Sequence, residues 1–463
     1  MPKIAIVGAG QAGLLAAHAL NRQGHDVTLY SDRSPDDFLQ RAKPTGAAGR
    51  FKVALDFERS LGLEHWGDEA NRCDGVHLTF SPREGNQLLT LLGRLPGPDL
   101  MAIDLRMQSA VWMDELAAQG GRVEIRSVSV DDLDEISAQN DLTLVAAGRG
   151  EIMRLFPRDR ERSTYSEPQR FLAMVCFTRD SKTVPYAPWF APIKFNFFQR
   201  YGEMFYMPWY SKDRRQGTVC LFEAKTGSPL DRFRECRSGE DVLRIGREVV
   251  RELMPWDGDL FEGADLCDDH SWLTGSFTPE VRQVVGTLPS GRHVMALGDT
   301  AHSLDPIGGQ GANNGNRMVQ VLVEAIAVHG ERPFDEAWMR ATFDRFWERH
   351  HLGDALNNTL LEPLTGPGRR LLMAQYGSTG KPGDDSPQQR LADLFMQNFD
   401  DPTLLTPAFH DPKRATAVLR EVFGSAARPV MRGARRIARA QVRQRLGRPP
   451  HHPGTGVPQA RTA

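Results

Sequence analysis

The chain has 463 residues, with 57 lysines and arginines against 59 aspartates and glutamates, so its formal charge is −2. Hydrophobic residues make up 40% and charged residues 25% of the sequence, which is ordinary globular composition for a chain of roughly two or three domains. A chain of this length and composition buries a large core, which excludes a disordered regulator, a fibrous repeat and a disulfide-built secreted module.

The five cysteines are scattered, with no Cys-x-x-Cys pair, and no histidine cluster completes a zinc site. Scattered, reduced thiols are typical of a cytosolic protein. No basic segment precedes the first apolar run, and no apolar run reaches the roughly 18 residues of a membrane span. We therefore expect a cytoplasmic protein without a metal and without a membrane span.

The chain opens with an apolar run over residues 3–7, a helical pattern over 14–24 and a second apolar run over 26–30. This order predicts a β-α-β unit. Between its first strand and its helix lies a Gly-x-Gly-x-x-Gly motif, where a dinucleotide fingerprint belongs: the glycines permit a tight turn, close approach of a pyrophosphate, and close helix–strand packing. The residues expected to contact the dinucleotide at this helix N-terminus are Gly8, Gly10, Gln11, Ala12 and Gly13.

The end of the second strand departs from the fingerprint, which normally has an acidic residue there to hold the adenosine ribose. Ser31 takes that position and Asp32 follows it. Either Asp32 or Ser31 could bind the ribose, and Arg33 could lie along the adenosine. The alternative is that Asp32 only begins a turn.

Two later apolar runs, over residues 142–148 and 292–299, end in glycine and are typical of buried parallel strands. The residues between them, from about 165 to 275, alternate like an antiparallel sheet and contain the densest aromatic segment, Tyr186 to Tyr210. Helical patterns dominate after residue 310 and break at a Gly/Pro-rich segment, 363–387.

A second motif, GDTAHSLDPIGGQGAN, spans Gly298 to Asn313. Asp299 follows the strand and is placed to accept hydrogen bonds from polyol hydroxyls. Pro306 then fixes the chain, and a glycine-rich turn starts a helix whose N–H groups and positive dipole end face any anion in front of it. His302 is expected to be structural, without a role in chemistry.

This second motif resembles the flavin-ribityl motif of FAD-dependent monooxygenases built on the aromatic-hydroxylase fold. The resemblance implies that the aspartate holds the ribityl chain of FAD and that the helix start faces the N1/O2 edge of the isoalloxazine. The cofactor contacts expected here are Gly298, Asp299, Pro306, Gly309, Gly311, Ala312 and Asn313.

A closer resemblance, up to about residue 410, is to the oxygenase component of two-component styrene and indole monooxygenases. The segments that carry it are VTLYSDRSPDDF (27–38), LGLEHW (61–66), IDLRMQ (103–108), EPQRFLAMV (167–175), GEMFYMPWYS (202–211) and NFDDPTLL (398–405). It implies reduced FAD delivered by a separate NAD(P)H-dependent flavin reductase. It also implies a flavin C4a-(hydro)peroxide, formed with O2, that epoxidises or hydroxylates an apolar aromatic, styrene- or indole-like substrate. Members are often homodimers.

The same resemblance suggests individual residues. Arg106 would lie near the FAD phosphates with Gln108 beside the cofactor; the alternative is an ordinary helix-surface arginine. Thr45 aligns near a family asparagine close to the flavin and substrate, without the histidine that follows in the family. Further FAD contacts are expected from Arg41, Lys43 and Gly148, and the residues expected nearest the reaction are Thr45, Pro306 and Gly309.

Two other activities stay open on the same fold. A single-component NAD(P)H-dependent hydroxylase would carry an Asp-Gly pair after the third strand, where this chain reads AAGRGE (146–151). A flavin-dependent halogenase would carry a WxWxIP segment, which the sequence lacks; a reductase on the same fold is a further alternative.

The fold class expected is α/β: a discontinuous Rossmann-like FAD-binding domain, a β-rich substrate domain and a helical C-terminal region. The expected boundaries are 1–75, 101–165 and 276–330 for the FAD domain, 76–100 and 166–275 for the substrate domain, 331–447 for the helical region and 448–463 for a disordered tail. From Pro412 onward the chain has 12 basic residues and one acidic residue. This segment could bind nucleic acid, acidic lipid or a partner; we favour a solvated basic helix without a nucleic-acid partner, because no aromatic residues interleave with the charges.

Overall fold

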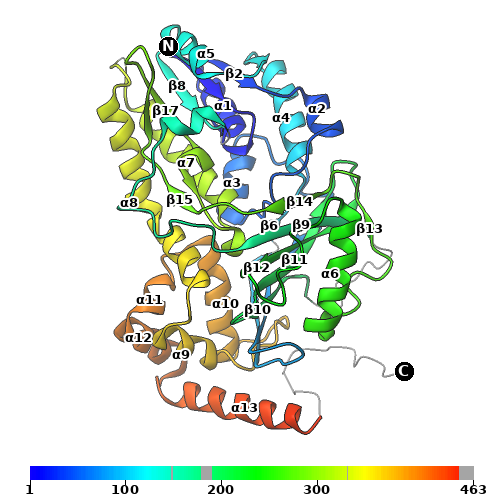
Figure 1. The fold of residues 1–463 in the computed structure, drawn as a ribbon. Helices are drawn as coiled ribbons and strands as arrows, with labels where there is room; N and C mark the ends of the chain where they lie inside the picture. Colours follow the sequence, from blue (N-terminus) through cyan, green and yellow to red (C-terminus); the bar gives the residue numbers. More distant parts are fainter. Residues whose placement is uncertain (98, 148–149, 179–189, 331, 448–463) are drawn as a thin grey trace. The chain divides into compact units, whose positions relative to one another are not determined.

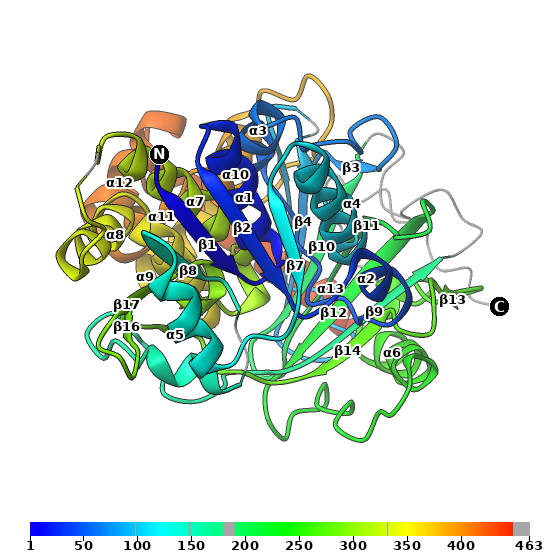
Figure 2. The same ribbon diagram turned by 90° about the horizontal axis from the view of Figure 1, so that it is seen from above.

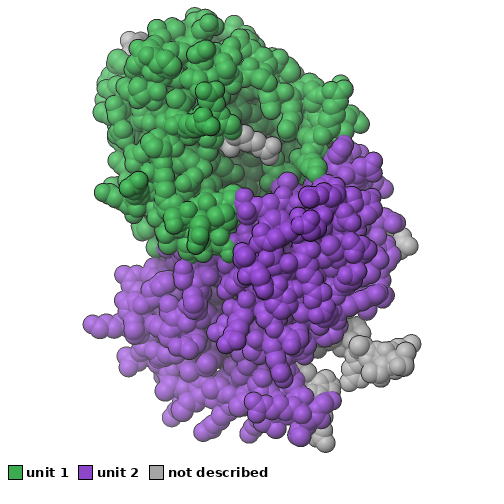
Figure 3. Space-filling view, in the orientation of Figure 1, with its two compact units in different colours: residues 1–69, 103–169, 277–354 green, residues 70–102, 170–276, 355–463 purple. Residues whose placement is uncertain are grey.

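The computed structural model describes residues 1–97, 99–147, 150–178, 190–330 and 332–447. The chain divides into two compact units, shown in different colours in Figure 3. Unit 1 consists of residues 1–69, 103–169 and 277–354, and unit 2 of residues 70–102, 170–276 and 355–463. Of the C-terminal helical residues, 331–354 thus group with unit 1 and the remainder with unit 2. Within the described ranges, no helix is long and apolar enough to cross a membrane.

Unit 1 is built on a six-stranded sheet in the order β16-β17-β8-β1-β2-β7. Its strands are β1 Lys3–Val7, β2 Asp26–Ser31, β7 Arg122–Ile125, β8 Leu142–Val145, β16 Val285–Thr287 and β17 His293–Ala296. All neighbours are parallel except β16 and β17. The apolar runs that we expected to form buried parallel strands do so, because both faces of this sheet are covered by helices.

Helices cover both faces of the sheet in unit 1. Which face a connecting helix covers depends on whether the chain crosses the sheet toward β7 or back toward β8. The helices are α1 Gln11–Arg22, α2 Pro35–Gln40, α3 Lys52–Ser60, α4 Leu105–Ala118, α5 Val130–Ala138, α7 Gly311–Ala327 and most of α8 Glu336–Leu361. The chain moves outward from β1 to β7 through α1 and α4, which contact each other. It then returns to β8 through α5, and a right-handed return must use the opposite face (Figure 2).

Unit 2 contains an eight-stranded, mostly antiparallel sheet in the order β13-β9-β12-β11-β10-β4-β5, with β14 also paired to β9. The strands are β4 Gly75–Ser81, β5 Leu89–Arg94, β9 Phe171–Thr178, β10 Pro192–Phe198, β11 Gly202–Tyr210, β12 Gln216–Ala224, β13 Asp265–Leu266 and β14 Trp272–Gly275. Helix α6, Gly239–Leu253, packs Val242 and Val249 onto one face of it, against Phe222.

A buried polar cluster lies within the same sheet. Lys194 on β10 is fully buried and its Nζ donates to Thr79 Oγ1 (2.9 Å) and Asn196 Oδ1 (2.8 Å). Asp257 is also buried, with its Oδ2 3.7 Å from the lysine Nζ, and it accepts from Asn196 Nδ2 (2.6 Å) and the Tyr206 hydroxyl (3.2 Å). Burial lowers the pKa of Lys194 well below its ordinary value and raises the pKa of Asp257 well above its own.

Five helices end unit 2: α9 Gly366–Ala374, α10 Pro387–Asp400, α11 Thr406–His410, α12 Pro412–Phe423 and α13 Arg428–Arg445 (Figure 1). The expected break over residues 363–387 is wrong in part, because α9 forms inside it. Thr365 caps this helix by accepting from the Gly368 N–H at 3.0 Å, and Pro367 occupies the first turn, where a missing N–H costs nothing.

Candidate cofactor site

The first glycine loop joins β1 to α1, and two of its glycines are required by packing alone. Gly8 has a φ of +117°, and a Cβ there would lie 2.6 Å from the Ala146 carbonyl oxygen. A Cβ on Gly13 would lie 2.0 Å from the Gly8 carbonyl oxygen. Gly10 is different: it is exposed, with a φ of −78° and no atom within 4 Å of its Cβ position. The space beside Gly10 is therefore open, as a dinucleotide pyrophosphate requires.

The N-terminus of α1 supplies donors at this open space. The helix begins at Gln11, and Gly10 in the capping position offers no side-chain acceptor. No acidic residue lies in the first turn. The first N–H groups of the helix are therefore left for an external acceptor, and the helix dipole favours an anion there. These features fit the phosphates of FAD.

The second glycine motif packs directly against the first. Gly298 has a φ of +60°, and a Cβ there would lie 2.7 Å from the Ala12 Cβ. Gln11 Nε2 donates to Asn316 Oδ1 on α7 at 3.0 Å. Helices α1 and α7 contact each other. Two motifs that are remote in sequence thus lie side by side within unit 1.

Asp299 follows Gly298 directly, in the short 3-10 helix η3 Gly298–Thr300. Surrounding protein displaces water from its carboxyl and so raises its pKa above the ordinary value, while His302 and Arg282 favour the charged form. The side chain is nevertheless exposed. A carboxyl that is both accessible and partly dehydrated is well suited to accept hydrogen bonds from the hydroxyls of an entering ligand.

The turn after Asp299 leads into the N-terminus of α7. Residues Pro306–Gly308 form the 3-10 helix η4, and Gly309 follows with a left-handed φ of +59°. Gln310 does not cap α7 with its side chain, and nothing lies within 4 Å of the Gly311 Cβ position. The N–H groups at this helix start, including that of Ala312, are therefore open to an acceptor.

The side-chain amide of Asn313 is hydrogen-bonded to backbone groups of the protein. Its Nδ2 donates to the carbonyls of Gly49 (2.9 Å) and Gly309 (2.8 Å), and its Oδ1 accepts from the Phe51 N–H (2.9 Å). These bonds hold the 49–51 segment onto α7. Only the backbone of Asn313 remains for the cofactor contact that the sequence predicted.

At the end of β2, the three candidates for the adenosine differ in availability. The Ser31 hydroxyl donates to the Arg33 carbonyl (2.6 Å) and accepts from its N–H (3.1 Å). The Arg33 guanidinium lies over the Phe38 ring, 5.8 Å from its centroid. Asp32 is exposed, without a hydrogen bond to its carboxylate from any described residue. This leaves Asp32 as the most available ribose ligand of the three.

The irregular segment after α2 carries three further predicted residues. Arg41 is exposed and pairs with Asp37 at 2.9 Å. Lys43 is partly buried, and desolvation lowers its pKa. Thr45 is exposed. The predicted contact Gly148 lies outside the described residues.

Arg106 is buried, so the alternative of a helix-surface arginine is wrong. Its guanidinium pairs with Asp104, which caps α4, through Nη2 to Oδ2 (2.7 Å) and Nε to Oδ1 (2.9 Å). It also donates to the Ala42 carbonyl at 3.2 Å. The residue therefore ties α4 to the 41–45 segment. Whether it approaches the phosphates stays a prediction.

A buried polar chain behind the two loops joins the predicted Gln108, which is itself buried, to three residues that sequence reasoning missed: Arg50, Glu58 and Asn316. Arg50 is fully buried; its Nη1 donates to Gln108 Oε1 at 2.5 Å, and its Nε lies 3.6 Å from Glu58 Oε2. Asn316, the partner of Gln11, donates to Glu58 Oε1 at 3.1 Å. Burial raises the pKa of Glu58, although Arg50 and Asn316 favour its charged form. The chain of contacts links both glycine loops to α4.

His302 is structural, as the sequence indicated. It is buried, with Nδ1 3.2 Å from Asn314 Nδ2 and Nε2 3.1 Å from Asp354 Oδ1. The bonds fix the segment between η3 and η4, and so the approach to α7.

In unit 2, strand alternation divides the aromatic segment between the two faces of the sheet. Phe195 and Phe205 pair across β10 and β11 with ring centroids 4.9 Å apart, and Phe197 lies 5.5 Å from Phe195 and 5.2 Å from Phe80. These four rings form one aromatic face. The opposite face packs into the core with α6. Residues 186–189 of the segment lie outside the described residues.

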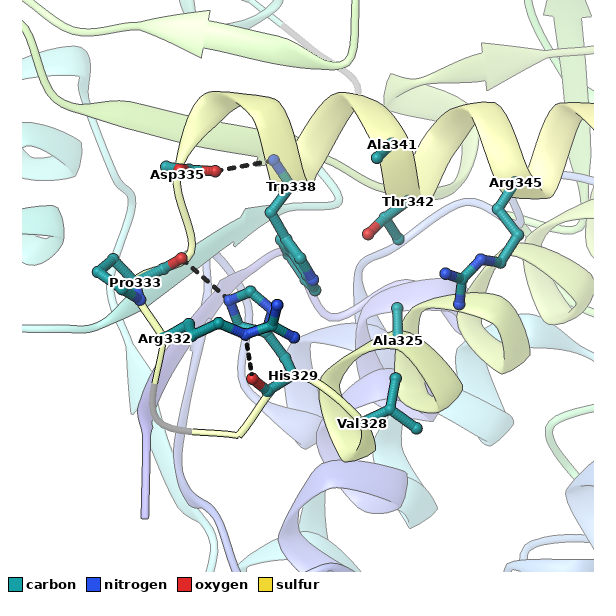
Figure 4. A pocket seen from close by; sticks show the side chains of 10 residues that line it. All are labelled: Ala325, Val328, His329, Arg332, Pro333, Asp335, Trp338, Ala341, Thr342 and Arg345. Carbon is teal, nitrogen blue, oxygen red and sulfur yellow. Dashed lines mark hydrogen bonds between the residues drawn. The ribbon is translucent and has the colours of Figure 1, made fainter.

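A cavity of about 480 Å³ lies where α7 ends and α8 begins (Figure 4). His329 and Trp338 face each other in it with centroids 5.1 Å apart, and Arg332 and Arg345 also line it. His329 Nε2 donates to the Pro333 carbonyl at 3.0 Å. None of the predicted site residues lines this cavity.

Two segments of the chain match known protein families. Residues 6–35 match the family described as "NAD(P)-binding Rossmann-like domain", and residues 148–259 match "Styrene monooxygenase A putative substrate binding domain". The protein is a flavin-dependent monooxygenase, with FAD as cofactor and O2 as co-substrate.

The chain is similar to the styrene monooxygenases. It is 28% identical to styrene monooxygenase StyA of Pseudomonas fluorescens over 421 residues, 89% of this chain and 96% of that protein. Kynurenine 3-monooxygenase of Saccharomyces cerevisiae is 24% identical over 71% of this chain and 75% of its own length. The flavin-dependent brominase Bmp2 superposes with a TM-score of 0.58 over 91% of this chain and 98% of that chain; at 13% identity this shows the fold alone.

We expect Asp299→Ala to weaken FAD binding roughly 10- to 100-fold, because the ribityl hydroxyls would lose a charged acceptor worth about 1.5–3 kcal/mol. Quenching of FAD fluorescence on titration measures the affinity. Asp131→Ala, an exposed aspartate in the first turn of α5, is the matched control and should bind FAD normally. Equal affinities for the two variants would contradict the assignment.

Proposed function

We propose that the protein uses reduced FAD from a separate NAD(P)H-dependent flavin reductase, together with O2, to oxygenate an apolar aromatic substrate of the styrene or indole type. The reaction is epoxidation or hydroxylation. The observation that carries this proposal is the similarity to styrene monooxygenase StyA over 89% of the chain. The match of residues 148–259 to the styrene monooxygenase substrate-binding domain supports it.

In this proposal the chain binds and orients the cofactor through two helix starts. The N–H groups at the start of α1 hold the phosphates, and Asp299 holds the ribityl hydroxyls. The N–H groups at the start of α7 stabilise negative charge on the flavin ring. Thr45, Pro306 and Gly309 are proposed to lie nearest the reacting atoms. Bound reduced FAD supplies the activation of O2, since oxygen chemistry belongs to the cofactor.

The aromatic face of unit 2 is the proposed substrate surface. Its rings are Phe80, Phe195, Phe197 and Phe205, and two of them, Phe195 and Phe205, are almost fully buried. Such a surface favours a planar apolar ring and excludes water. Charged or strongly polar substrates would lose their hydration without compensation there.

The runner-up is a single-component hydroxylase that binds NAD(P)H itself. The segment after β8 reads AAGRGE, without the Asp-Gly pair that such enzymes carry by resemblance, which favours external reduction.

Turnover with defined electron sources tests the proposal. Purified protein is supplied with O2, styrene or indole, and FAD reduced by an unrelated NADH-dependent flavin reductase; mass spectrometry identifies the products. We expect a product one oxygen atom heavier than the substrate. Substrate-stimulated NADPH consumption without the reductase would establish the runner-up instead, and the absence of oxygenated product from any apolar aromatic would contradict the substrate class.

A further inference from the structure

Helix α13 carries a high net positive charge, whereas the other residues together carry a net negative charge. It contains seven arginines and no acidic residue: Arg428, Arg432, Arg435, Arg436, Arg439, Arg443 and Arg445. Because the whole chain has a formal charge of −2, the other residues together carry −2 − 7 = −9. No aspartate or glutamate follows Glu421, so no neighbouring acid in this part of the sequence neutralises the helix.

One side of α13 is fixed to unit 2. A Cβ on Gly433 would lie 1.9 Å from the Met373 carbonyl oxygen at the end of α9, so the two helices touch backbone to backbone. Arg436 donates to the Tyr376 carbonyl at 3.3 Å, and Gln444 donates to the Gln87 carbonyl at 2.6 Å. Figure 1 shows α13 in red along the outer side of α9. The helix is a docked, ordered element with a defined free side.

The free side combines arginines with exposed apolar side chains. Arg432, Arg435 and Arg439 follow the i, i+3, i+7 spacing of one helix side, are exposed, and form no ion pair with any described residue. On the same side, Met431 is 51% exposed and Val442 is 54% exposed, three turns apart; Leu446 just beyond the helix is 67% exposed. These are among the most exposed large apolar side chains of the described residues.

We propose that the free side of α13 binds the surface of an anionic lipid bilayer. Guanidinium groups pair with lipid phosphates in a bidentate manner, and each basic residue near an anionic surface adds to the affinity. The interspersed Met431, Val442 and Leu446 enter the boundary between head groups and acyl chains. A nucleic acid would use the arginines alone, because the apolar side chains add nothing to phosphate contacts and the helix has no aromatic residue for base stacking.

Bilayer binding gives the oxygenase access to its substrate class, a consequence that rests on the proposed function. Small apolar aromatics concentrate in lipid because the hydrophobic effect drives them out of water. An enzyme held at the bilayer surface meets them where they accumulate. The binding itself is independent of turnover, so it is tested without substrate.

Co-sedimentation with lipid vesicles tests the proposal on the FAD-loaded full chain. We expect binding to vesicles of phosphatidylglycerol and phosphatidylcholine in equal parts, weak binding to pure phosphatidylcholine, and loss of binding at high salt. The triple variant Arg432→Gln/Arg435→Gln/Arg439→Gln should bind about 100-fold more weakly, at roughly fivefold per arginine. Met431→Ser/Val442→Ser should bind several-fold more weakly at unchanged charge.

The matched control removes the same charge elsewhere in unit 2. Arg237→Gln/Arg244→Gln/Arg251→Gln replaces three exposed arginines outside α13 and should leave vesicle binding unchanged. All variants should keep the FAD content and thermal midpoint of the parent protein. The proposal is overturned if the parent chain stays in the supernatant with anionic vesicles, if the control loses as much affinity as the α13 variant, if the serine variant binds normally, or if duplex DNA displaces the protein from vesicles. If the protein forms oxygenated product but does not bind vesicles, the bilayer proposal fails and the proposed oxygenase function stands.

Discussion

Replacing Gly10 with valine is expected to lower FAD affinity by about 100-fold while the protein itself folds normally. Gly10 has an extended φ of −78° that any residue adopts, and its Cβ position meets no protein atom within 4 Å. The valine side chain would fill the open space in front of α1 and keep phosphates from its N–H groups. Losing charge-assisted hydrogen bonds of about 3 kcal/mol in total corresponds to roughly 100-fold in affinity.

Calorimetric titration with FAD and thermal unfolding of the cofactor-free protein measure the two effects separately. Gly366→Val is the matched control, since Gly366 also lies at a helix N-terminus and also has an open Cβ position; it should bind FAD normally. Gly13→Ala provides the contrast, because its Cβ would lie 2.0 Å from the Gly8 carbonyl oxygen, and it should destabilise the fold itself. Normal FAD affinity in Gly10→Val would mean that the open space is not the phosphate site.

The two glycine motifs could be predicted from sequence because each depends on local rules. Gly8 and Gly13 are needed where a strand turns into a helix that packs on it, and Gly309 is needed where the chain takes a left-handed φ. Periodicity likewise identified the parallel strands of unit 1, since buried strands read as continuous apolar runs. The contact between the two motifs, through Ala12 and Gly298, could not be predicted from the sequence of either motif.

The residues that sequence reasoning missed have partners far away in the chain. Arg50 and Gln108 are 58 positions apart, and Glu58 and Asn316 are 258 apart. No spacing rule relates such pairs, because only the packing of α3, α4 and α7 brings them together. Arg106 shows the same limit: its position on α4 was evident, but its burial follows from how that helix packs.

Replacing Lys194 with methionine in unit 2 is expected to cost about 3–5 kcal/mol of unfolding free energy, the usual penalty when one partner of a buried charge pair is removed. Methionine keeps the apolar bulk of the lysine in the sheet, so packing changes little. Asp257 would keep its bonds from Asn196 and Tyr206 but lose the nearby ammonium group, 3.7 Å away. The midpoint of urea unfolding measures the effect.

The loss of unfolding free energy in Lys194→Met should depend on pH, because Asp257 is a buried titrating carboxyl. Burial already raises its pKa, and removing Lys194 raises it further, since a neighbouring cation favours the charged form. A carboxyl whose pKa is raised on folding stabilises the folded state below its unfolded value of about 4, and this contribution is lost as pH rises through the folded pKa. The variant should therefore lose less stability at about pH 5 than at about pH 8. Adding Asp257→Asn should remove this pH dependence and recover part of the loss, because the neutral amide oxygen can still accept from Asn196 Nδ2 while its NH2 group donates to the Tyr206 hydroxyl oxygen. Equal losses at both pH values would show that Lys194 acts through packing alone.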